Sequence, residues 1–135
     1  MQLAPLMAHT MAEALRNDGD ANTLTQAYTL RVLSESPRTF KELVAMRRVS
    51  APTLSRSIEA MVRRGWVERV PHPSDRRQRQ LQLTAEGQAE FERLRSRVQQ
   101  HLARRFDSLD DKARRLLWQS LALLEEILQS EQAGH

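Results

Sequence analysis

The stretch VERVPHPSDRRQRQLQLT, residues 67–84, decides the fold. Apolar and polar side chains alternate at both of its ends, which is typical of strands with one buried face. Two prolines, a serine and an aspartate lie between these ends and favour a turn. The stretch therefore predicts a β-hairpin, and its tip carries Arg76, Arg77 and Arg79.

Residues 39–65, just before the hairpin, predict two short helices. The first begins with a capping box, in which the side chains of Thr39 and Glu42 each satisfy a backbone N–H at the helix start. Ser50 can cap the second helix, which has a proline in its first turn, and Gly65 ends it. The positions predicted to be buried recur at helical spacing: Phe40, Leu43 and Val44 in the first helix, and Leu54, Ile58, Met61 and Val62 in the second.

Two helices of this length joined by so short a turn fit a helix-turn-helix. An ordinary helical hairpin would show the same pattern, so the two helices alone leave both interpretations open. The β-hairpin that follows separates them, because a two-stranded ribbon after the second helix is typical of a winged helix-turn-helix.

Helices are also predicted on both sides of this region. Residues 2–17 form one that ends in the loop NDGD, and a second, capped by Thr25, ends before Pro37. A long helix is predicted from Thr84 to about residue 105, and a last one from Asp110 to about residue 130. The predicted fold class is therefore mainly α with a small β-hairpin wing (α+β), in a single domain of residues 1–135.

The last predicted helix carries LLWQSLALLEEIL, residues 116–128, which is apolar around much of its circumference. A helix this apolar near the end of a small domain is not covered by its own chain alone. We therefore expect residues 1–18 and 88–131 to form dimerisation helices of a homodimer on either side of a winged-helix lobe of residues 24–87. The predicted dimer contacts are leucines: Leu6, Leu116, Leu117, Leu121, Leu124 and Leu128.

Positive charge is concentrated in the middle of the chain. Residues 38–80 contain eleven basic and four acidic side chains, whereas the flanking segments are each close to neutral. A basic block of this kind indicates a surface for an anionic polymer, and double-stranded DNA is the expected partner. A solvated arginine-rich surface is the alternative, since nineteen of the 21 basic residues are arginine.

The second of the two central helices is the expected recognition helix. Its small hydroxyl side chains let the backbone approach a major groove, and Arg56 can reach a guanine. At the hairpin tip, arginines meet the strong negative potential of a narrow minor groove, and Asp75 is expected to pair with Arg77 and hold it extended. A solvated polar face is the alternative for the helix. The predicted DNA-binding residues are Ser50, Pro52, Thr53, Ser55, Arg56, Ser57, Arg76, Arg77 and Arg79.

The composition argues against several other classes of protein. No cysteine is present, which excludes disulfides and thiolate metal sites within the chain. None of the four histidines has a catalytic spacing and no glycine-rich phosphate loop occurs, so we predict neither an enzyme nor a cofactor. A metal site formed by His9, Glu13 and His101 is a minor alternative. No apolar run approaches the roughly 18 residues of a membrane span, and no signal peptide is recognisable, so a cytoplasmic protein is expected.

Residues 24–33, LTQAYTLRVL, and residues 41–87, KELVAMRRVSAPTLSRSIEAMVRRGWVERVPHPSDRRQRQLQLTAEG, resemble the core of the MarR family of winged-helix regulators. The wing signature DRR…LT..G occurs as Asp75, Arg76, Arg77, Leu83, Thr84 and Gly87. The resemblance implies a homodimer whose recognition helices enter the major grooves of a pseudo-palindromic operator. It also makes Arg77 the minor-groove arginine and Asp75 its partner.

Many members of this family are repressors that small phenolic or other lipophilic ligands release, so the resemblance implies a small-molecule effector as well. Since 23 residues precede Leu24, we expect a first helix that is short for the family. Two alternative functions fit the same fold: a winged helix that binds protein instead of DNA, and a metal-responsive regulator.

Overall fold

The computed structural model describes residues 3–16, 23–46 and 49–133. Contacts divide the chain into two units, residues 1–99 and residues 100–135, and each is considered by itself. The predicted loop at residues 17–20 and the first half of the predicted turn at residues 47–50 lie outside the described residues.

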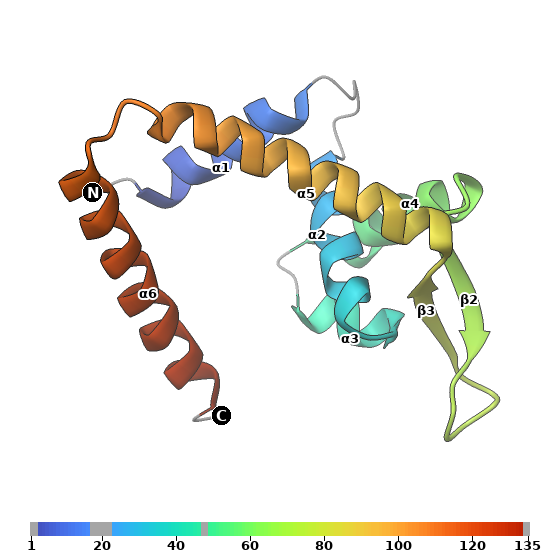
Figure 1. The fold of residues 1–135 in the computed structure, drawn as a ribbon. Helices are drawn as coiled ribbons and strands as arrows, with labels where there is room; N and C mark the ends of the chain where they lie inside the picture. The colour runs from blue at the N-terminus through green and yellow to red at the C-terminus, as the bar shows by residue number, and fades with distance from the viewer. Residues whose placement is uncertain (1–2, 17–22, 47–48, 134–135) are drawn as a thin grey trace. The chain divides into compact units, whose positions relative to one another are not determined.

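The chain is mainly helical with one small antiparallel sheet, which confirms the predicted fold class (Figure 1). Its helices and strands, in chain order, are α1 (Leu3–Leu15), α2 (Thr23–Glu35), β1 (Arg38–Thr39), α3 (Phe40–Met46), α4 (Ala51–Arg63), β2 (Val67–Pro71), β3 (Arg79–Leu83), α5 (Ala85–Phe106) and α6 (Asp111–Ala133).

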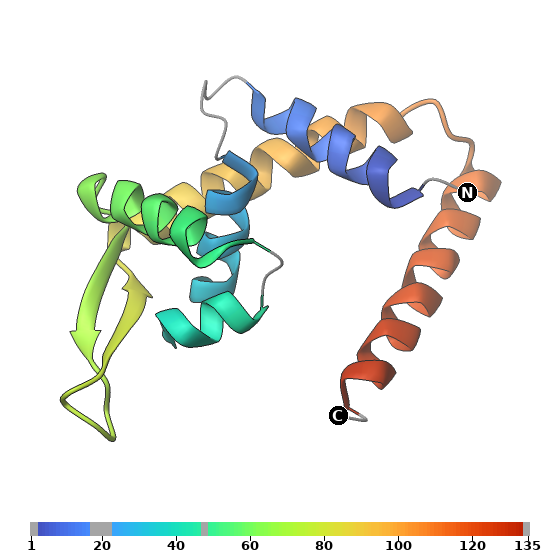
Figure 2. The same cartoon turned by 180° about the vertical axis from the view of Figure 1, so that it is seen from behind.

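The sheet has three strands in the order β1-β3-β2, one more than the predicted hairpin. In the hairpin, Val67 pairs with Leu83 and Pro71 with Arg79. The added strand β1 pairs Arg38 with Leu81 on the other side of β3. The hairpin extends beyond the helices of the lobe as an arm, the wing (Figure 2).

The helix starts follow from local hydrogen bonds. At α3 the capping box is present as predicted: Thr39 N–H donates to Glu42 Oε2 at 2.7 Å, and Glu42 N–H donates to Thr39 Oγ1 at 3.2 Å. The bond from the Thr39 N–H also lowers the pKa of the Glu42 carboxyl below its usual value. The prediction that Thr25 caps α2 is wrong, because the helix already begins at Thr23, and the Thr25 carbonyl accepts a bond from Thr29 Oγ1 at 2.8 Å.

The hydrophobic core lies in residues 1–99. It joins one side of α2, α3 and α4 to the wing base and to the first half of α5. The predicted stripe of α4 is buried through Leu54, Ile58 and Met61, whereas Phe40 at the start of α3 is 38% exposed and lines a surface hollow instead of the core. The buried core side chains are Leu15, Leu30, Val32, Leu33, Leu43, Leu54, Ile58, Met61, Val67, Leu81 and Leu94.

The wing is joined to α4 and α5 at two glycines. Gly65 has φ +75°, a conformation that glycine adopts without steric cost, and it ends α4 as predicted. Thr84 bridges the two ends of the hairpin: its N–H donates to the Trp66 carbonyl at 3.0 Å and its hydroxyl donates to the Gly65 carbonyl. Gly87 N–H donates back to Thr84 Oγ1 at 3.0 Å, and a Cβ on Gly87 would lie 1.9 Å from Trp66 O. The LT..G spacing therefore closes the base of the wing.

In residues 100–135, α6 begins as predicted, since Ala113 N–H donates to Asp110 Oδ1 at 2.7 Å. The helix continues three residues beyond the predicted end at Ser130. Its large apolar side chains are mostly exposed, Leu116 by 63% and Trp118 by 69%. Among the helices of the described residues, none combines the length and apolar character needed to span a bilayer.

Candidate nucleic-acid interface

The N-terminus of α4 presents a fixed pair of hydroxyl groups. Ser50 is the N-cap, and its Oγ accepts from the Thr53 N–H at 3.3 Å and donates to Thr53 Oγ1 at 2.8 Å. Pro52 occupies the first turn, where its missing N–H costs little. The positive end of the helix dipole makes this end suited to a phosphate oxygen.

The exposed face of α4 carries most of the predicted DNA-binding residues. Pro52, Ser55 and Arg56 are exposed, and Thr53 is half-buried. Ser57 differs: it is 0% exposed and packs within the core. The prediction that Ser57 contacts DNA is therefore corrected, because a side chain on the buried side of α4 cannot reach a groove.

The wing tip is held by its own backbone. Asp75 Oδ1 accepts from the Arg77 N–H at 3.0 Å, and the Asp75 carbonyl accepts from the Gln78 N–H at 3.0 Å. The His72 N–H donates to the Gln78 carbonyl at 3.0 Å and closes the loop. Asp75 was expected to pair with the guanidinium of Arg77, but it bonds the backbone N–H of that residue instead. Arg76, Arg77 and Arg79 are all exposed.

The structure also shows an ion pair between α4 and the wing that the sequence analysis did not predict. Arg69 on β2 forms an ion pair with Glu59 on α4. The two residues are ten positions apart and lie on different elements, so no helical or strand period connects them. Both side chains are about half exposed.

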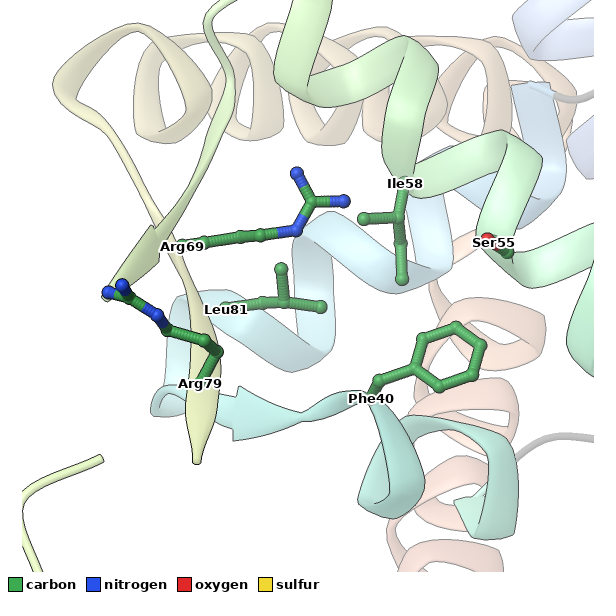
Figure 3. A pocket seen from close by; sticks show the side chains of 6 residues that line it. All are labelled: Phe40, Ser55, Ile58, Arg69, Arg79 and Leu81. Carbon is green, nitrogen blue, oxygen red and sulfur yellow. The ribbon is translucent and has the colours of Figure 1, made fainter. Parts of the chain in front are cut away.

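A hollow of about 220 Å³ lies between α4, the start of α3 and the wing. Phe40, Ile58 and Leu81 supply apolar surface. The guanidinium of Arg69 extends toward α4, whereas that of Arg79, which also lines the hollow, points away from it (Figure 3). Ser55 lines the same hollow from α4. Apolar walls with a few polar groups are typical of small-molecule sites.

The residues of the alternative metal site come from both units: His9 and Glu13 lie on α1 and His101 lies on α5 in residues 100–135. His9 Nε2 lies 3.5 Å from Glu13 Oε1, an i,i+4 pair on α1. Within the residues that the structure describes, no three histidine or acidic side chains are grouped so that they could hold a metal ion.

The predicted dimer leucines are largely uncovered within the chain. Leu117 is half-buried. The exposed ones are Leu6, Leu116, Leu121, Leu124 and Leu128.

The sequence of the chain is similar to those of known proteins from one family. A sequence model of the MarR family matches residues 23–78. An uncharacterized HTH-type transcriptional regulator of Mycobacterium bovis, Mb0904, is 31% identical over 116 residues, which cover 82% of this chain and 81% of the relative. Such regulators are not enzymes, as the sequence predicted.

Solved structures share the fold. RV1404 from Mycobacterium tuberculosis superposes with a TM-score of 0.78 at 22% identity, over 93% of this chain and 86% of that chain. A mutant MarR from E. coli, crystallised in complex with operator DNA, superposes with a TM-score of 0.62 at 27% identity, over 90% of this chain and 82% of that chain.

Proposed function

This chain belongs to the MarR family of transcriptional regulators, and from that premise we propose that it is a homodimeric repressor of a pseudo-palindromic operator. The recognition helix α4 of each protomer enters a major groove, and each wing reaches the flanking minor groove. The proposed lobe for DNA comprises residues 24–87, and the proposed dimerisation helices comprise residues 1–18 and 88–131.

The observation that carries this proposal is the placement of exposed hydroxyls and arginines on one lobe. Ser50 and Thr53 present hydroxyls at the start of α4, and Arg56 follows one turn later. The bond between Asp75 and the Arg77 N–H shapes the wing tip without using the guanidinium of Arg77. Base-reading side chains on a helix and arginines on an arm suit two different grooves. The proposed contacts are Ser50, Pro52, Thr53, Ser55, Arg56, Arg76, Arg77 and Arg79.

The proposal of a homodimer is supported by the exposed leucines of α6. A contiguous apolar face this large on a helix marks an interface, because water contact with it is costly. A dimer also provides two recognition helices, and a two-fold axis between them requires an operator with two inverted half-sites.

Selection of bound duplexes from a random pool tests the proposal directly. We expect two inverted half-sites with centres about 10 base pairs apart, or a multiple of this, which matches one turn of DNA. The affinity for the selected duplex should fall steeply as salt rises, because bound arginines release counterions from the phosphates. A selection that enriches no sequence, or an affinity that does not change with salt, would contradict DNA binding and favour a protein partner.

We further propose that a small lipophilic anion releases the operator. Support comes from the hollow beside α4, where Phe40, Ile58 and Leu81 offer an apolar surface to a ring and Arg69 offers a charge to a carboxylate. Titrating 4-hydroxybenzoate into the complex with the selected duplex should release the DNA, and neutral phenol should release less. If a panel of phenolic carboxylates leaves the complex intact, the hollow does not serve as an effector site.

A further inference from the structure

The recognition helix α4 has one acidic side chain, Glu59. It lies four residues after Ser55 and three after Arg56, spacings that place side chains side by side on a helix surface. All three are exposed. The carboxylate therefore lies on the face that the proposed function brings to DNA, where phosphates would repel it.

The wing strand β2 supplies a partner for this carboxylate. Arg69 Nη2 donates to Glu59 Oε1, and the ion pair joins β2 to α4. The side chains are 43% and 49% exposed, so the pair is open to an approaching polyanion. Figure 3 shows Arg69 extending toward α4, whereas Arg79 on the neighbouring strand points away from it.

An exposed ion pair contributes little to folding stability. Its effect on DNA binding is larger, because a lone carboxylate is repelled by every phosphate within the screening length of about 8–10 Å. Without Arg69, the carboxylate would also be available to Arg56, one turn earlier on the same helix, and would draw that guanidinium away from a base.

We propose that Arg69 is a positioning residue for DNA binding that acts through Glu59. It neutralises the one acid on the recognition helix and keeps that acid away from both the phosphates and Arg56. The inference rests on the proposed function, since it concerns the same interface. A direct contact between Arg69 and a phosphate makes a different prediction, and the two are separable by mutation.

The test compares variants of the full chain on the duplex recovered by selection, with affinity measured by fluorescence anisotropy. Arg69→Ala should weaken binding about tenfold, because the unpaired carboxylate now faces DNA. Adding Glu59→Gln should restore binding about tenfold in this background, yet change wild-type affinity by less than about threefold. The difference between the two backgrounds is the readout, because loss of a direct phosphate contact would leave the effect of Glu59→Gln the same with and without Arg69.

Glu68→Gln is the matched control. Glu68 is the neighbour of Arg69 on β2 and its carboxylate accepts from Gln82 Nε2, so the variant removes the same charge without touching α4. It should rescue Arg69→Ala by less than about threefold. Thermal melting of each variant verifies that it is folded.

Two results would overturn the proposal. If Glu59→Gln tightens binding by the same factor with and without Arg69, Arg69 contacts DNA on its own. If Glu68→Gln rescues as well as Glu59→Gln, only total charge matters. A wild-type chain that binds no duplex would instead remove the proposed function itself.

Discussion

Replacing Gly87 by alanine should destabilise the fold, although alanine is the better helix former. A Cβ at this position lies 1.9 Å from Trp66 O and 2.8 Å from Trp66 C. Both atoms belong to the backbone, so no side-chain rotation relieves the overlap. Because real Cβ contacts are essentially never shorter than 3.0 Å, α5 must move by about 1 Å from the base of the wing.

The loss of folding stability can be worked out from the contacts that a shift of α5 would strain. The Thr84 N–H bonds Trp66 O at 3.0 Å, and the Gly87 N–H bonds Thr84 Oγ1 at 3.0 Å. Overpacking costs about 1–3 kcal/mol and a weakened hydrogen bond about 1 kcal/mol, whereas the helix preference of alanine returns about 1 kcal/mol. The net loss is about 2 kcal/mol, which lowers the Tm by roughly 6–8 °C.

Thermal unfolding followed by circular dichroism measures this shift. Gly65→Ala is the control, since its Cβ has nothing within 4 Å and the cost comes from φ +75° alone, about 1 kcal/mol. For Gly87→Ala, the direction of the change in Tm tests whether the close approach to Trp66 matters. Without the close approach, alanine would raise the Tm through its helix preference, so a Tm equal to or above that of the wild type refutes the reasoning.

Four further outcomes are expected. Arg77→Ala should weaken operator binding by about 1–3 kcal/mol in a titration; an unchanged affinity would remove the wing from the interface. Asp75→Asn retains an oxygen acceptor for the turn, so it should bind DNA better than Asp75→Ala; equal affinities would mean that the turn does not depend on this bond. Leu121→Asp places a charge in the proposed dimer interface, and light scattering should detect monomers; a persistent dimer would place the interface elsewhere. Because the folded-state pKa of Glu42 is lowered, its stabilisation is full above a pH of about 4.5 and is lost as the pH falls through the folded pKa. The difference in Tm between wild type and Glu42→Gln should therefore shrink from pH 7 to acid; a constant difference would contradict the capping role.

The helices could be predicted because their signals are local. The box of Thr39 and Glu42, the cap at Ser50 and the stop at Gly65 each lie within one turn of the backbone that they fix. Strand β1 could not be predicted, since its two residues are too short to show alternation and become a strand only by pairing with β3.

Fewer of the candidate DNA-binding residues could be predicted correctly. At Ser57 the polar side chain indicates an exposed position, whereas the helical period indicates a buried one. Ser57 lies three residues after Leu54 and four before Met61, so period alone places it in the core. Its hydroxyl suggested an exposed position instead, and the period prevailed because the backbone of α4 fixes which way each residue points. The wing signature, by contrast, located the Asp75 turn correctly but not the atom that Asp75 bonds.

Most acidic side chains of the basic block, residues 38–80, are bound by neutral donors and not by its arginines. Residues 38–80 contain four: Glu42, Glu59, Glu68 and Asp75. Each is engaged within the lobe, by the Thr39 N–H, by Arg69, by Gln82 Nε2 and by the Arg77 N–H, respectively. Three of these partners are neutral donors, and Arg69 is the one cation among the four partners. An acid bound in this way fixes backbone or side-chain geometry and leaves the exposed wing-tip arginines Arg76, Arg77 and Arg79 to an external polyanion. The Asp75 carboxylate at the wing tip is therefore compatible with DNA binding, because the structure that it stabilises presents Arg77.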